Sequence, residues 1–283
     1  FKTANLDEVK ALPGVAHVLT IKGDETPESL FDGVAILSTS WWSANQAREA
    51  LKIEWDMSAV SGFSTEGYAA QAAERLKGKA DGDIVRAGDV DAAFAGAAKT
   101  VSAQYDYPFL AHGTLEPQNC TALFKDGAIE IWAPTQNPES GRGLVAKALN
   151  LPPEKIRINF TRIGGGFGRR LMNDYMVQAA AIAAQLPGVP VKLLFNRQQD
   201  MQRDFYRPAG WHGFRAALDK GGKLTAFHDH FVTFGKDGKP VRSAEMSASE
   251  IPAGLIDTIL LEQSFLSSNM PTGWLRAPGS NAL

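Results

Sequence analysis

Four of the five residues at positions 164–168 are glycines, and two arginines follow directly (GGGFGRR, 164–170). Glycine has no side chain to hold a ligand away from the backbone. A β-rich run at 155–161 precedes this glycine loop, and a helical run at 173–186 follows it. A glycine-rich turn between a strand and a helix presents unpaired N–H groups and the positive end of a helix dipole to a ligand, and the two arginines add cations. The pattern favours an anionic or phosphate-bearing cofactor; a close-packed turn is the alternative.

Several nucleotide-binding and hydrolase motifs are absent from the sequence. The glycine loop lacks the G-x-G-x-x-G spacing and the ribose-binding acid of a dinucleotide site. The chain also has no P-loop, no G-x-S-x-G motif and no H-E-x-x-H motif. These absences disfavour a hydrolase. They weaken, without removing, the alternative of a nucleotide-dependent enzyme that binds phosphates with the glycine loop.

Two pairs of polar residues have spacings that metal sites also use. His112 and Glu116 are four residues apart, but a glycine and a proline within this segment disfavour the helix that would bring them together. His228 and His230 share one face of a predicted strand, and no third ligand lies nearby in the sequence. For His112 and Glu116 the sequence therefore favours a structural hydrogen-bonding role over metal binding or acid–base work. For His228 and His230 it favours solvated or hydrogen-bonded side chains over metal binding.

The composition is that of an ordinary globular protein, with 283 residues, 44% of them hydrophobic and 21% charged. A net charge of −2 argues against a nucleic-acid partner. No apolar run approaches the roughly 20 residues of a membrane span. The single cysteine, Cys120, excludes an iron–sulfur cluster held by this chain alone, since such clusters use about four thiolates. We expect the chain, which begins at Phe1 and stops at Leu283, to be a piece of a longer protein.

The periodicity predicts an α+β fold with a small α/β unit at 1–57, a linker with a helix at 58–85 and mixed α/β layers at 86–283. The glycine-rich stretch at 78–88 favours a boundary between two units. Residues 196–208 are predicted to form a charged connector, and residues 247–266 are predicted to be partly helical. Asp-Gly at 126–127 predicts a hairpin, as does the glycine-containing turn at 219–222. The predicted helices cover 6–12, 41–51, 64–77, 90–97, 139–150 and 173–186. The predicted strands cover 15–22, 33–38, 51–55, 98–107, 122–124, 128–132, 155–161, 190–195, 211–218 and 223–234.

Three loops, taken together and in this order, resemble a known family. They are Thr135-Gln136, the glycine loop, and Arg276 within LRAPG at 275–279. The combination resembles the molybdopterin-binding subunit of the xanthine dehydrogenase and aldehyde oxidase family. The forms GGGFGRR, DFYRP (204–208) and HGTLEPQN (112–119) are similar to the large (beta) subunit of isoquinoline 1-oxidoreductase. The resemblance covers essentially the whole chain, and implies a partial hammerhead unit at 1–57 and an incomplete first molybdopterin-binding region at 86–283.

The resemblance also implies a set of cofactor-contacting residues. Gln136 matches a glutamine whose amide reaches toward an apical oxygen ligand of molybdenum, and Phe167 matches a residue whose backbone approaches the metal. Arg276 matches an arginine whose loop passes near metal and cofactor. These three residues would lie near molybdenum without being direct ligands. The full implied set is Gln136, Gly165, Gly166, Phe167, Gly168 and Arg276.

The implied activity is hydroxylation of an aldehyde or an N-heterocycle with oxygen derived from water. The implied cofactor is molybdopterin, in its cytosine dinucleotide form, with 2Fe-2S clusters on a partner iron–sulfur subunit. The family's general-base glutamate would lie beyond Leu283, in the remaining half of the subunit, so the chain alone is expected to be inactive. Arg207 matches a substrate-side arginine, whereas Leu171 stands where many relatives have an acid. The resemblance implies the bacterial cytoplasm or periplasm and does not decide between them. A cofactor-free binding or assembly module with the same fold is the alternative function.

Overall fold

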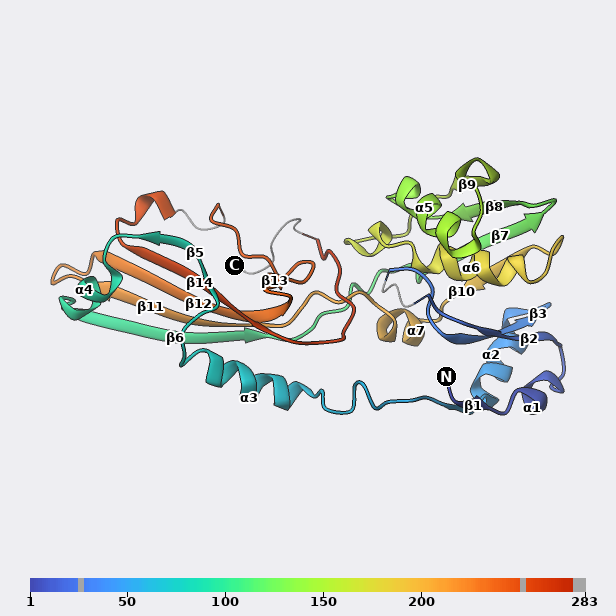
Figure 1. The fold of residues 1–283 in the computed structure, drawn as a ribbon, viewed down its shortest axis with the longest axis horizontal. Helices are drawn as coiled ribbons and strands as arrows, with labels where there is room; N and C mark the ends of the chain where they lie inside the picture. The colour runs from blue at the N-terminus through green and yellow to red at the C-terminus, as the bar shows by residue number, and fades with distance from the viewer. Residues whose placement is uncertain (25–27, 250–252, 277–283) are drawn as a thin grey trace. The chain divides into compact units, whose positions relative to one another are not determined.

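The chain folds into two compact units, and each unit is assembled from two separate stretches of sequence (Figure 1). The computed structural model describes residues 1–24, 28–249 and 253–276. The first unit comprises residues 1–61 and 113–203, and the second comprises residues 62–112 and 204–283. Within the described ranges, no helix combines the length and the apolar character needed to cross a bilayer.

The first unit combines short strands with five α-helices in its described residues. Its first stretch contains β1 (Thr3–Ala4), α1 (Leu6–Lys10), β2 (Val15–Ile21), β3 (Gly33–Ser38), α2 (Trp41–Ala50) and β4 (Ile53–Glu54). Its second stretch contains β7 (Asn119–Lys125), β8 (Ala128–Ala133), α5 (Pro138–Leu149), η1 (Pro153–Lys155), β9 (Ile156–Phe160), η2 (Arg169–Leu171), α6 (Asp174–Ala184), β10 (Val191–Leu194) and α7 (Arg197–Gln202).

Helix α6 is the centre of the first unit. A four-stranded sheet with the order β10-β7-β8-β9 packs against α6, and residues of β2 and β3 join the same apolar cluster. Nine of the eleven residues of α6 are buried. A helix that is apolar nearly all round must be covered on several sides, and this accounts for its alanine-rich sequence. The strands β8 and β9 are parallel neighbours, so the loops that follow them leave the sheet at one edge.

The second unit is built on one large sheet. Its elements are α3 (Thr65–Arg75), β5 (Gly82–Ala87), α4 (Val90–Ala95), β6 (Lys99–Tyr107), β11 (Gly210–Leu218), β12 (Leu224–Lys236), β13 (Lys239–Pro240), η3 (Ala253–Leu255) and β14 (Ile259–Leu266). The strand order is β5-β14-β12-β11-β6, with β13 paired to β12. Alternation along β12 sends Val232 and Phe234 into a cluster with α3, and Phe231 into a second cluster with Met246.

The predicted α+β class is confirmed, and so are both predicted hairpins. β7 and β8 are joined by Asp126 and Gly127, which have φ angles of 51° and 71°, as the common two-residue hairpin turn requires. β11 and β12 form the second hairpin. β9 lies where the sequence predicts a strand before the glycine loop.

Three predictions from local sequence are wrong. Residues 259–266 form the strand β14 instead of a helix, because pairing with β12 on one side and β5 on the other satisfies their backbone. β5 itself lies in the glycine-rich stretch expected to be a boundary. The expected connector at 196–208 contains α7, whose Asn196 and Gln199 form a capping box. Long-range strand pairing caused the first two errors, whereas the capping box was readable in the sequence.

The histidines of the large sheet have the predicted hydrogen-bonding roles. His228 Nε2 lies 2.8 Å from Glu262 Oε1, and His230 Nε2 lies 2.8 Å from Ser264 Oγ. On the opposite face, His212 Nδ1 lies 2.9 Å from Asp229 Oδ2. Among the described residues there is no group of three or more His, Cys, Asp or Glu arranged to hold a metal ion. The pKa of His230 is lowered from its ordinary 6.5, chiefly because burial disfavours the charged imidazolium, and Glu262 opposes this shift.

We expect His230 to make the second unit less stable in acid. A base with a lowered pKa in the folded state binds fewer protons folded than unfolded, so its contribution to stability is present above pH 6.5 and is lost as the pH falls below that value. His230→Gln should therefore lose less stability than wild type between pH 7.5 and 5.5 in urea denaturation. The exposed His17 provides the control His17→Gln. Equal losses in both variants would contradict the assignment.

Candidate functional site

The glycine loop, residues 164–168, leaves the end of β9 with a distorted backbone. Gly165 and Gly168 have φ angles of 103° and 110°, and Phe167 has a φ of 53° although it is not a glycine. Throughout the described part of the chain, the backbone N–H groups of residues 165–168 have no hydrogen-bond acceptor. Four successive unpaired donors on a half-exposed loop suit an anion or an electronegative ligand atom.

Gln136 lies beside this loop because of the parallel pairing of β8 and β9. Ala133 at the end of β8 pairs with Phe160 at the end of β9, so residues 134–137 and 161–168 leave the sheet together. The backbone N–H of Gln136 donates to the carbonyl oxygen of Arg170 at 3.0 Å. A Cβ at Gly166 would lie only 2.7 Å from Gln136 Oε1, so a side chain at this position would displace the Gln136 amide from its place beside the loop. The Gln136 side chain is exposed, and no described residue hydrogen-bonds its amide.

The segment that holds Gln136 is fixed to the start of α6. Thr135 Oγ1 donates to Asn173 Oδ1 at 2.8 Å, and Asn173 Nδ2 donates to the carbonyl oxygen of Asn137 at 2.9 Å. The hydroxyl of Tyr175 donates to the carbonyl oxygen of Pro134 at 3.0 Å. These bonds leave the Gln136 amide as the free polar group of a rigid segment.

The two arginines after the glycine loop are turned inward, which corrects the prediction that they add cations for a ligand. Arg169 is 1% exposed and makes a two-point ion pair with Asp174, at 2.8 and 3.0 Å. Arg170 is fully buried, and its Nη2 lies 3.0 Å from Glu116 Oε2. A buried guanidinium needs such partners, so these charges are neutralised within the chain.

The predicted structural roles of His112 and Glu116 are confirmed by two separate networks. In the first unit, Glu116 Oε2 accepts a hydrogen bond from Gly164 N–H at 2.8 Å. In the second unit, His112 Nδ1 lies 2.9 Å from Asp204 Oδ1, and its Nε2 lies 2.6 Å from the carbonyl oxygen of Trp274. Sequence reasoning missed that Glu116 holds the glycine loop, because the two segments are 48 residues apart.

Arg276 and Arg207, the other two predicted site residues, belong to the second unit. Arg276 is exposed, and positions 277–279 of its loop lie outside the described residues. Arg207 is half-buried, with its guanidinium carbon 4.6 Å from the centre of the Tyr107 ring. The roles of Arg276 and Arg207 toward cofactor or substrate stay predictions. The structure therefore brings together Gln136 and the glycine loop from the predicted set.

Comparison with known proteins identifies the family. The molybdopterin cofactor-binding domain matches residues 75–238, which is more than half of the chain. The chain belongs to the molybdopterin cofactor-binding domain family. This match confirms the predicted resemblance to molybdopterin-binding subunits.

Relatives of this family are much longer than the chain. A membrane-bound aldehyde dehydrogenase (pyrroloquinoline-quinone) of Gluconacetobacter polyoxogenes is 31% identical over 95% of this chain and 37% of its own length. The aldehyde oxidoreductase molybdenum-binding subunit PaoC of Escherichia coli K12 is 30% identical over 69% of this chain and 26% of its own length. The beta subunit of isoquinoline 1-oxidoreductase from Brevundimonas diminuta, the predicted branch, is 27% identical over 71% of this chain and 26% of its own length.

The fold is also similar to that of solved structures. Quinoline 2-oxidoreductase from Pseudomonas putida 86 matches 97% of this chain and 40% of its own chain, with a TM-score of 0.70 and 17% identity.

The residues of the first unit fit a cofactor of this kind. The unpaired N–H groups of 165–168 and the free amide of Gln136 can hydrogen-bond the electronegative atoms of an anionic pterin. The missing side chain at Gly166 keeps this surface open. Arg169 and Arg170 are each paired with a carboxylate inside the unit, so the hydrogen-bonding groups offered to the ligand are neutral.

The buried ion pair between Arg169 and Asp174 leads to a testable prediction about stability. Replacing Asp174 with alanine removes one side of the buried Arg169–Asp174 ion pair, and breaking a buried pair in this way costs about 3–5 kcal/mol. The matched control is Glu139→Ala, which breaks the exposed Glu139–Arg142 pair and should cost about 0–1 kcal/mol. Urea denaturation of both variants measures the difference. Similar losses in the two variants would show that burial does not set the strength of the Arg169–Asp174 pair.

Proposed function

We propose that the first unit holds a molybdenum-bearing pterin against Gln136 and the glycine loop. The supporting observation is the meeting of these two segments at the carboxyl ends of the parallel strands β8 and β9. Ligands of α/β sheets commonly bind at this edge, where successive loops converge. The Gln136 amide orients the ligand by donating or accepting one hydrogen bond, and the 165–168 N–H groups stabilise negative charge.

The complete protein is proposed to be a molybdenum hydroxylase that oxidises an aldehyde or an N-heterocycle. When bound, the cofactor supplies two-electron oxidation of a C–H bond with oxygen from water. The names of two relatives, aldehyde oxidoreductase and isoquinoline 1-oxidoreductase, support this pair of substrate classes. Arg276 would add a cation near the cofactor, and Arg207 would lie on the substrate side. The general-base glutamate is expected beyond Leu283, so the chain by itself would be inactive.

The finer assignments of cofactor and partner rest on the resemblance. The pterin is proposed to be in the cytosine dinucleotide form, with 2Fe-2S clusters on an iron–sulfur partner subunit and the rest of the molybdopterin-binding subunit completing the site. Cys120 supports placing the clusters elsewhere: it is 1% exposed, and burial raises the pKa of its thiol. Within this proposal, residues 1–57 form the hammerhead-like unit, 58–85 the linker and 86–283 the molybdopterin-binding region.

Metal and cofactor analysis of the complete protein tests this function. We expect about one molybdenum per polypeptide and fluorescent pterin after oxidative extraction. Absence of both would favour the cofactor-free binding module. Recovery of pyrroloquinoline quinone without molybdenum would instead favour the cofactor named for the Gluconacetobacter relative.

Gln136→Ala provides a test at the level of a single residue. Removal of one preorganised hydrogen-bonding group at a reacting centre typically lowers turnover about 100-fold or more. We expect this loss in turnover per bound molybdenum, with an unchanged melting temperature, because the Gln136 side chain is exposed. The control is Gln185→Ala, which removes an exposed amide at the end of α6. Wild-type turnover in the Gln136 variant would rule out its role.

A further inference from the structure

The carboxylate of Glu116 contacts the glycine loop at its first residue. Glu116 Oε2 accepts a hydrogen bond from Gly164 N–H at 2.8 Å, and Glu116 N–H donates to the Gly164 carbonyl oxygen at 3.1 Å. A Cβ at Gly164 would lie 2.5 Å from the Glu116 Cβ, so the two backbones approach as closely as a glycine permits. The segment before the distorted backbone is therefore fixed to the 113–119 loop at two points.

Arg170 contacts the same loop from the other end of the glycine loop. Its Nη2 donates to Glu116 Oε2 at 3.0 Å, to the Glu116 carbonyl oxygen at 3.0 Å and to the Pro117 carbonyl oxygen at 3.3 Å. Arg170 is fully buried, and Glu116 is the acidic residue paired with it in the described chain. A buried cation with one carboxylate partner strongly favours the conformation that keeps the pair together.

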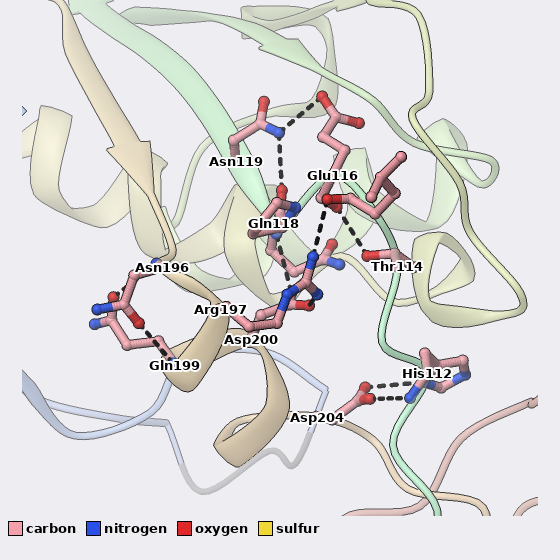
Figure 2. Close-up of polar contacts among 12 residues, drawn as sticks. His112, Thr114, Glu116, Gln118, Asn119, Asn196, Arg197, Gln199, Asp200 and Asp204 are labelled. Carbon is pink, nitrogen blue, oxygen red and sulfur yellow. Dashed lines mark hydrogen bonds and ion pairs between the residues drawn. The ribbon is translucent and has the colours of Figure 1, made fainter.

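The 113–119 loop is itself held rigidly, so Glu116 is a fixed anchor (Figure 2). Arg197 donates to the Leu115 carbonyl oxygen at 2.9 Å, and Asp200 accepts from Gln118 N–H at 3.0 Å. Both residues lie on α7. Asn119 Nδ2 donates to the second carboxylate oxygen of Glu116 at 3.1 Å, which fixes the rotation of the carboxyl group.

We propose that Glu116 and Arg170 are positioning residues that act as a clamp across the glycine loop. One carboxylate oxygen binds residue 164 before the distorted stretch and residue 170 after it, so residues 165–168 are held open with their N–H groups unpaired. Left-handed backbone at a non-glycine residue persists only when its surroundings enforce it, and the clamp provides that enforcement at Phe167. The role of the open loop as a cofactor cradle rests on the proposed function, whereas the clamp rests on the contacts above.

The experiment compares Glu116→Gln with wild type in the complete protein, using two measurements. Hydrogen exchange at the Gly164 amide reports the clamp, and molybdenum per polypeptide reports the cradle. In the variant we expect the Gly164 amide to exchange at least tenfold faster, with exchange in α6 unchanged. We expect molybdenum content to fall below half of the wild-type value. Glu139→Gln, at the exposed Arg142 pair of the same unit, should change neither quantity.

The exchange pattern distinguishes a local clamp from a general effect on stability. Unchanged exchange at Gly164 would overturn the proposal, and so would equal acceleration in α6, since that indicates general loss of stability. If the wild-type protein holds no molybdenum, the proposed function fails while the exchange result still decides the clamp. Should Glu116→Gln not fold, Arg170→Lys replaces it: lysine keeps the charge, but its side chain is shorter and its ammonium reaches less far than Arg170 Nη2, so the same faster exchange at Gly164 is expected.

Discussion

The parallel pairing of β8 and β9 is the constraint on which the candidate site depends. Parallel neighbours end at the same edge of a sheet, so the loops after them must emerge side by side. This places the Gln136 segment and the glycine loop together although about 30 residues separate them. The intervening chain forms α5 and η1, the kind of crossover that parallel strands require.

Buried charge is the second determinant of the site. Arg169 and Arg170 follow one another, yet each is neutralised by a different carboxylate, Asp174 in the next helix and Glu116 in a distant loop. An isolated buried guanidinium is so unfavourable that both pairs specify where the chain must go after the glycine loop. The two arginines therefore fix the conformation of the loop from inside the unit. The hydrogen-bond donors that face a ligand are neutral backbone N–H groups.

Local pattern and turn chemistry were enough to predict much of the fold and part of the site. The Asp126-Gly127 hairpin and the helix after the glycine loop followed from residue types in sequence, and the family resemblance linked Gln136 to that loop. β14 was missed because its run ILLEQSFL is compatible with either a helix or a buried strand, and partners far away in sequence decide between them. The contact between Glu116 and Gly164 was missed for the same reason, since no local pattern links the two residues.

Phe167 shows why the conformation of the site could not be read from the loop alone. Glycine adopts a positive φ readily, so the positive φ angles at positions 165 and 168 can be predicted from the sequence. Phenylalanine at 167 disfavours the same region, typically by about 1–2 kcal/mol. Its φ of 53° therefore has to be enforced by contacts outside the loop, and the two ends of the loop are where such contacts lie. The glycines make the open conformation accessible, and distant polar residues select it.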